Sequence, residues 1–127
     1  MKSTTKIAGV RFKERAAQGE LGIVRLPDSY KLPNRAYMIN SVKANGRSVL
    51  VIGHSETGHH HVMDAEKVYA YEMPDEAKML LVKEESALTH LRDYDTHKPL
   101  IFEPGKYMVT TLREFDAVKQ QSYLSRD

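Results

Sequence analysis

From residue 19 onward the chain alternates apolar and polar residues in short runs. In a β-strand, successive side chains point to opposite faces, so an alternation with a period of two residues is typical of a strand. The clearest run is Lys67–Glu72, in which Val68 and Ala70 alternate with Tyr69 and Tyr71. The pattern predicts strands over Glu20–Arg25, Ala36–Val42, Ser48–His54, His59–Met63, Lys67–Glu72, Lys78–Val82, Ala87–Leu91, Pro99–Phe102 and Tyr107–Leu112.

Turn chemistry separates these runs. Asn45 and Gly46 lie between two apolar runs, which is a strong signal for a two-residue hairpin. Pro and Gly residues interrupt the pattern at Met73–Glu76 and Glu103–Lys106. Only Arg11–Gln18 and Arg113–Asp127 suit a helix. The sequence therefore predicts an all-β fold, namely a small antiparallel β-sandwich or a barrel of the cupin or jelly-roll kind.

The same period predicts which side chains form the core. The expected core residues are apolar and occupy one face of each run: Leu21, Ile23, Val49, Val51, Val68, Ala70, Leu80, Val82, Leu100, Phe102, Met108 and Leu112. The other methionines are expected to fill gaps in the packing.

The length suits one domain. A chain of 127 residues with 41% hydrophobic residues can form its own core. We expect an extended basic N-terminal arm over residues 1–18, one β domain over 19–116 and a short C-terminal tail over 117–127.

Composition excludes several classes of protein. With no cysteine, the chain has no disulfide and no thiolate nucleophile or metal ligand. No signal-peptide pattern follows Met1–Lys6, and the longest apolar run, Val49–Ile52, is far shorter than a membrane span. We therefore expect no contact with a membrane, and a location in the host cytoplasm or in a particle assembled there.

Charge is mildly positive, with a formal net value of +2. This is too small to predict nucleic-acid binding. Cations nevertheless gather near the N-terminus and are the candidates for partner binding: Lys2, Lys6, Arg11, Lys13 and Arg15. The alternatives are a solvated basic tail and an arm that lies on an acidic surface.

Histidine is the chemically distinctive residue. The chain has six, and four of them lie within His54–His61. On a strand, His59 and His61 share one face while His60 points the other way. Two imidazoles spaced in this way can bind one divalent transition metal, such as zinc, iron, nickel or manganese. The candidate ligands are His59 and His61, followed by His90, His97 and His54, with Glu56 or Asp95 as an oxygen ligand.

The histidines have other readings. They suit a polar cluster that braces a turn, or a pH-responsive interface. Catalysis is not expected, because no phosphate loop, nucleophile elbow or His-Glu-x-x-His motif occurs. Glu56 as a base and Tyr94 or Tyr107 as a proton donor are the general acid–base candidates.

Three strings carry a family resemblance: Gly53–Val62 with its Gly-His-His-His-Val end, Thr96–Leu100, and Pro104–Tyr107 with Leu112–Phe115. Over residues 18–116 the chain resembles a small family of phage and prophage-borne proteins that has no firmly assigned activity. The resemblance implies a phage context, in which small β domains often serve as capsid decoration (cement) proteins. It therefore predicts a non-enzymatic virion protein whose partners are its own copies and the capsid protein. The alternative is a cupin-like metal-binding domain, enzymatic or sensory.

Overall fold

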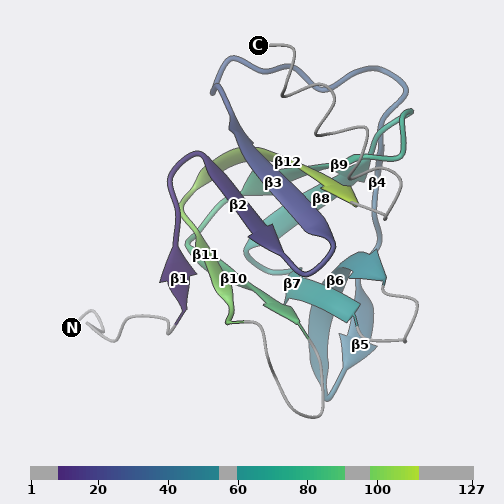
Figure 1. Cartoon of the computed structure of the whole chain (residues 1–127). Coiled ribbons are helices and arrows are strands. Elements are labelled where there is room, and N and C mark those ends of the chain that lie inside the picture. Colours follow the sequence, from purple (N-terminus) through teal and green to yellow (C-terminus); the bar gives the residue numbers. More distant parts are fainter. Residues whose placement is uncertain (1–8, 55–59, 91–97, 112–127) are drawn as a thin grey trace, which may run out of the picture.

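The computed structural model describes residues 9–54, 60–90 and 98–111. This part of the chain forms twelve strands and no helix, in two six-stranded sheets that pack together without closing into a barrel (Figure 1). The prediction of an all-β sandwich is confirmed. No helix in this part is long and apolar enough to cross a membrane.

The first sheet contains the histidine-bearing strands. Its neighbours are antiparallel except for β1 and β11, which are parallel. Its strands, in spatial order, are β1 (Val10–Arg11), β11 (Leu100–Phe102), β10 (Ser86–His90), β7 (His60–Asp64), β6 (Arg47–His54) and β5 (Val42–Ala44).

The second sheet is antiparallel throughout. Its strands, in spatial order, are β2 (Arg15–Gln18), β3 (Leu21–Leu26), β12 (Gly105–Thr111), β9 (Lys78–Val82), β8 (Val68–Glu72) and β4 (Tyr37–Met38). The strand expected over Ala36–Val42 is therefore divided, with β4 in this sheet and β5 at the edge of the other.

Residues 10–18 belong to both sheets. β1 pairs with β11 and β2 pairs with β3, so Arg15–Gln18 is a strand and the expected helical turn is not present. Between the two strands lies Phe12, whose ring centroid is 4.9 Å from that of Phe102 and 5.7 Å from that of Tyr107. Phe12 is only partly buried, and its packing against these two core rings holds the segment against the domain. Residues 1–8 and 112–127, with the expected tail, lie outside the described residues.

The core lies between the sheets and draws residues from both: Leu21, Ile23, Leu50, Ile52, Met63, Val68, Ala70, Leu80, Val82, Leu88, Leu100, Phe102, Tyr107 and Val109. The expected orientation of β6 is wrong. Leu50 and Ile52 are 3% and 1% exposed, whereas Val49 and Val51 are only partly buried. Val49 lies opposite the exposed Asp64, which places it on the outer face. A run that is apolar on both faces gives period two no means of choosing.

A smaller apolar cluster covers part of the outer face of the second sheet. Met73, Ala77 and Met79 form it, and Tyr30 and Met108 pack against it. The expectation that Met108 belongs to the main core is therefore wrong. Tyr30 lies in the connection between β3 and β4, whose position is held by Lys106. The Nζ atom of Lys106 donates to the carbonyls of Asp28 and Tyr30, at 2.7 Å each.

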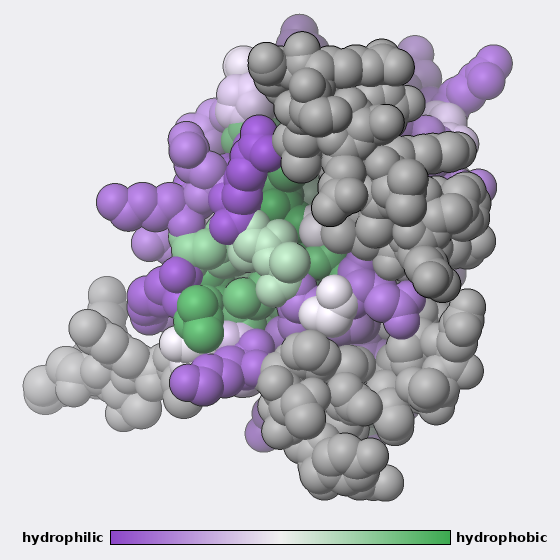
Figure 2. All heavy atoms as spheres, viewed as in Figure 1, coloured by the Kyte–Doolittle hydropathy of each residue, from purple (hydrophilic) through white to green (hydrophobic). Residues whose placement is uncertain are grey.

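Apolar atoms also reach the surface. Figure 2, drawn in the same view as Figure 1, shows hydrophobic residues in green near the centre of the face, around β1 and β2. Hydrophilic residues surround this green area. Val10 and Val24 are among the exposed large hydrophobic residues, at 45% and 41%.

Candidate metal centre

Three neighbouring strands carry four of the histidines. In the ladder between β6 and β7, His54 lies opposite His60. In the ladder between β7 and β10, His90 lies opposite His61. The fold thus brings residues that are distant in sequence to the same end of three adjacent strands. The segments 55–59 and 91–97, which contain His59 and His97, continue from these strand ends and lie outside the described residues.

A β-bulge sets this register. Between Val51 and Gly53 the β6 strand gains one residue relative to β7. Without the extra residue, His54 would lie opposite His59. With it, His54 lies opposite His60. A regular hairpin would have placed His54 on the same face as His59 and His61. The bulge instead places His54 on the face of His60.

Gly53 permits a close approach of β6 to the other sheet beside the bulge. A Cβ atom at this position would lie 2.8 Å from Cδ2 of Leu21 in β3. Such a separation is shorter than a normal carbon–carbon contact. The absence of a side chain at Gly53, which lies opposite His61, thus lets the core close next to the histidines.

His61 is a buried polar residue, with 2% of its surface exposed. Its Nδ1 atom lies 2.8 Å from Oε1 of Gln18, which is itself 3% exposed. The Nε2 atom of Gln18 donates to the carbonyls of Leu88, at 2.9 Å, and Lys98, at 3.0 Å. Carbonyls only accept hydrogen bonds, so the Gln18 amide nitrogen must face them and its oxygen must face His61.

This orientation determines the tautomer of His61. Because Gln18 Oε1 is an acceptor, Nδ1 of His61 carries the hydrogen and donates it. In the neutral ring the lone pair then lies on Nε2, which is the atom able to coordinate a metal. A histidine ligand usually has its other ring nitrogen held by a hydrogen bond in this way.

Gln18 contacts β10 near the point where its pairing with β11 ends and its pairing with β7 begins. β10 pairs with β11 over Ser86–Leu88 and with β7 over Thr89 and His90. The Gln18 amide bridges the carbonyl of Leu88 in β10 and that of Lys98, which lies just before β11. Sequence reasoning missed Gln18, because nothing in its local pattern distinguishes it from a surface glutamine.

The structure does not describe the remaining candidates for an oxygen ligand or a proton donor near the histidines. Glu56, Asp95 and Tyr94 lie outside the described residues. Within the described ranges, no group of three or more His, Asp or Glu side chains is placed to hold a metal ion. The prediction of a metal centre is therefore neither confirmed nor contradicted by these ranges.

Tyr107 is a core residue. Its side chain is 1% exposed, and its hydroxyl donates to the carbonyl of Glu103 at 2.6 Å. Burial raises its pKa, and the nearby charge of Arg25 partly opposes this effect. A hydroxyl enclosed in this way does not reach a substrate, so the assignment of Tyr107 as a proton donor is wrong.

The candidate partner-binding cations also differ in position. Arg11 forms an ion pair with the carboxylate of Glu85, and their hydrogen bond raises the pKa of the guanidinium. Lys13 and Arg15 are exposed. Lys2 and Lys6 lie outside the described residues.

Comparison with known proteins places the chain in a family. The profile of a family described as a domain of unknown function, DUF8820, matches residues 17–111. The chain belongs to the DUF8820 family. No curated protein and no solved structure matches it. The DUF8820 domain contains Gln18 and all six histidines, so the histidine end belongs to the part that defines the family.

Proposed function

We propose that this DUF8820 protein binds a divalent transition metal at the histidine end of β6, β7 and β10. The observation that carries the proposal is the strand register, which places His54 opposite His60 and His61 opposite His90. Imidazole is the ligand that zinc, nickel and related ions share. The same end of the sheet continues into the two segments that hold His59 and His97.

The hydrogen bond between His61 and Gln18 supports the proposal. Fixing the orientation of an imidazole inside a protein costs conformational entropy. When a hydrogen bond has already oriented the ring, that cost does not weaken metal binding. The buried amide of Gln18 has both its donor and its acceptor in use, so it holds the ring in one tautomer. A histidine ladder that only braced the sheet would bind no metal, and metal binding therefore separates the two readings.

The test uses the full chain purified without a tag and treated with EDTA. Zinc, nickel and manganese are each titrated by calorimetry, and mass spectrometry measures the metal that the untreated protein retains. We expect one ion per chain. His90→Gln should weaken binding at least tenfold, because its ladder position shares a face with His61. His60→Gln, whose position is on the opposite face, and the control Glu66→Gln, an exposed acid in the turn after β7, should leave binding unchanged.

A bound metal should also stabilise the fold. An ion at one hundred times its Kd adds about 2.7 kcal/mol to the free energy of unfolding. The thermal midpoint should therefore rise with the metal in the wild type and much less in His90→Gln. Absence of stoichiometric binding, or equal affinity in all the variants, would show that the histidines have another role.

An exposed apolar edge favours a second candidate function, that of a capsid decoration protein. Tyr37 and Met38 of β4 are 65% and 50% exposed, and Val42 of β5 is 50% exposed. β4 and β5 are edge strands of the two sheets and only three residues apart in the chain, so their apolar side chains lie along one side of the sandwich. Exposed edges of this kind are commonly covered by a partner.

This candidate is tested by assembly. The protein would associate with its own copies and with capsid protein through the β4–β5 edge. Light scattering after size exclusion and cosedimentation with phage particles from the host measure both associations. Tyr37→Ser with Met38→Ser should abolish them, while Lys31→Ser, also exposed, should not. A wild-type protein that stays monomeric and never sediments with particles would exclude the candidate.

A further inference from the structure

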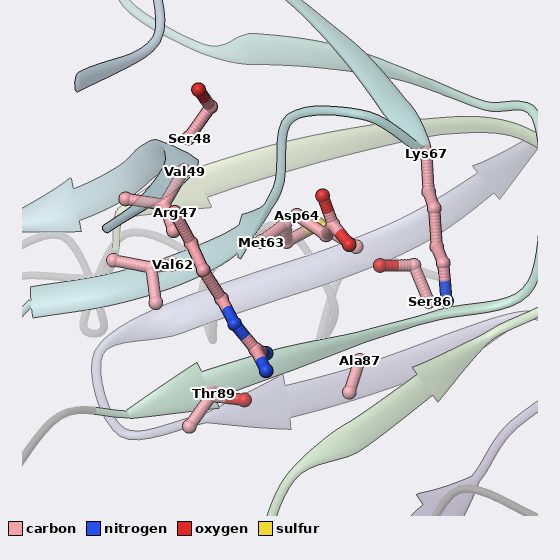
Figure 3. A pocket seen from close by; sticks show the side chains of 10 residues that line it. All are labelled: Arg47, Ser48, Val49, Val62, Met63, Asp64, Lys67, Ser86, Ala87 and Thr89. Atoms are coloured by element: carbon pink, nitrogen blue, oxygen red, sulfur yellow. The ribbon is translucent and has the colours of Figure 1, made fainter. Parts of the chain in front are cut away.

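A groove of about 300 Å³ lies on the outer face of the first sheet. It runs over β6, β7 and β10, and its floor includes Val49, Val62 and Ala87 (Figure 3). Val62 is only 8% exposed, so the floor is recessed as well as apolar. The volume is at the lower end of the ~300–1,000 Å³ typical of small-molecule sites.

Two cations border this groove. Figure 3 shows Arg47 of β6 extending across β7 toward Thr89 of β10, while Lys67 extends from the turn between β7 and β8 toward Ser86. In residues 9–54, 60–90 and 98–111, the ion pairs that form involve other cations, namely Arg11, Arg25 and Lys78. Arg47 and Lys67 thus form no ion pair with an acid among these residues.

One acid shares the groove. Asp64 lies between the two cations in Figure 3, and its Oδ1 atom accepts the backbone N–H of Glu66 at 2.8 Å. Two cations and one carboxylate leave a net charge of +1 on the lining side chains. This balance suits a ligand with a single negative charge, because a second one would be repelled by Asp64.

We propose that the groove binds a small aliphatic monocarboxylate. Its hydrocarbon part would cover Val49, Val62 and Ala87, and its carboxylate would accept hydrogen bonds from Arg47 and Lys67. The planar guanidinium of Arg47 offers two parallel donors that match the two oxygens of a carboxylate. This site is on the outer face, whereas the imidazole of His61 is buried between the sheets, so the inference does not depend on metal binding.

The experiment follows the backbone amides by ¹H–¹⁵N NMR while sodium octanoate is added to the full chain, with 1-octanol as the neutral probe of equal length. We expect saturable shifts at Val49, Val62, Ala87 and Thr89 with octanoate. 1-Octanol should bind at least tenfold more weakly, because it lacks the charge that pairs with the two cations.

Three variants separate charge from shape. Arg47→Gln and Lys67→Gln should each weaken octanoate binding about tenfold, and Ala87→Leu should abolish it by filling the floor. Arg35→Gln, an exposed cation outside the groove, is the matched control and should bind like the wild type. Circular dichroism establishes that each variant is folded.

Several outcomes would overturn the proposal: no saturable shift, shifts that map to another face, equal binding of 1-octanol, or equal binding by folded Arg47→Gln and Lys67→Gln. Zinc titration of Ala87→Leu distinguishes the two sites. Loss of octanoate binding with metal affinity kept would locate the carboxylate in the groove alone. A failed metal titration of the wild type would leave the octanoate result unaffected.

Discussion

The Oε1 atom of Gln18 accepts the Nδ1–H of His61 at 2.8 Å and joins β2 of one sheet to β7 of the other. The same amide also donates to the carbonyls of Leu88 and Lys98 in the first sheet. One side chain thus satisfies three polar groups at the histidine end.

Gln18→Leu keeps the volume of the side chain but removes its hydrogen bonds. Because a buried polar group without a partner costs about 1–3 kcal/mol, we expect the free energy of unfolding to fall by about 3 kcal/mol. Urea unfolding followed by circular dichroism measures the change. Arg15→Gln, an exposed substitution on the same strand, should stay within about 0.5 kcal/mol of the wild type. Equal stability of Gln18→Leu and Arg15→Gln would contradict the assigned role.

Gly53→Ala should strain the core beside the bulge. The new Cβ atom would lie 2.8 Å from Cδ2 of Leu21, and overpacking of this kind costs about 1–3 kcal/mol. Leu21→Val shortens the opposing side chain. We expect the double variant to be more stable than the sum of the two single effects predicts, and a double-mutant cycle by urea unfolding measures the coupling. Strict additivity would show that the two residues do not press on each other.

The hairpin between β5 and β6 requires left-handed backbone at two successive residues. Asn45 and Gly46 have φ angles of 52° and 80°, which is the signature of a type I′ turn. No atom lies within 4 Å of a Cβ built on Gly46, so Gly46→Ala tests conformation without a clash. It should destabilise the fold by about 1–2 kcal/mol in urea unfolding. Asn45→Gly should change the stability by less than about 0.5 kcal/mol, and a comparable loss there would argue against the turn type.

The buried hydroxyl of Tyr107 predicts a loss of stability in alkali. Burial raises the pKa of Tyr107 in the folded state above that in the unfolded chain. Below pH ~10 the phenol is protonated in both states, and above it the unfolded chain loses the proton first. The free energy of unfolding should therefore decrease as the pH rises from about 10 toward the folded pKa.

Tyr107→Phe removes this titration, so its stability should decline less between pH 9 and pH 11 than that of the wild type. Urea unfolding across that range measures both slopes. Parallel slopes in the two proteins would show that other groups cause the alkaline loss.

Much of the fold was predictable because its signals are local. The alternation over Val68–Glu72, the Asn45–Gly46 turn and the Pro104–Gly105 pair at the start of β12 each involve residues close in the chain. Strands β1 and β2 were not predicted, because they are short and form by pairing with distant strands. Phe12 was the one aromatic signal in that segment.

The candidate site was predictable only as a set of histidines. The alternation of His60 and His61 follows from strand geometry, and His61 is the buried one of the two. Which histidine lies opposite which depends on the extra residue between Val51 and Gly53, and a bulge has no reliable signature in an apolar run. The partnership of His61 with Gln18 joins residues 43 positions apart and has no local trace.

By itself, the sequence determined that this chain is an all-β protein with one strongly specified hairpin and an unusual concentration of histidine. Short-range chemistry sets these properties, since they depend on alternation, turn residues and composition. Only the tertiary structure decided that Leu50 and Ile52 face inward while Val49 lines an outer groove. It also decided the histidine register and the burial of Gln18. These depend on which strands pair and on how the two sheets fit together, and such long-range packing chooses among alternatives that the local pattern leaves equal.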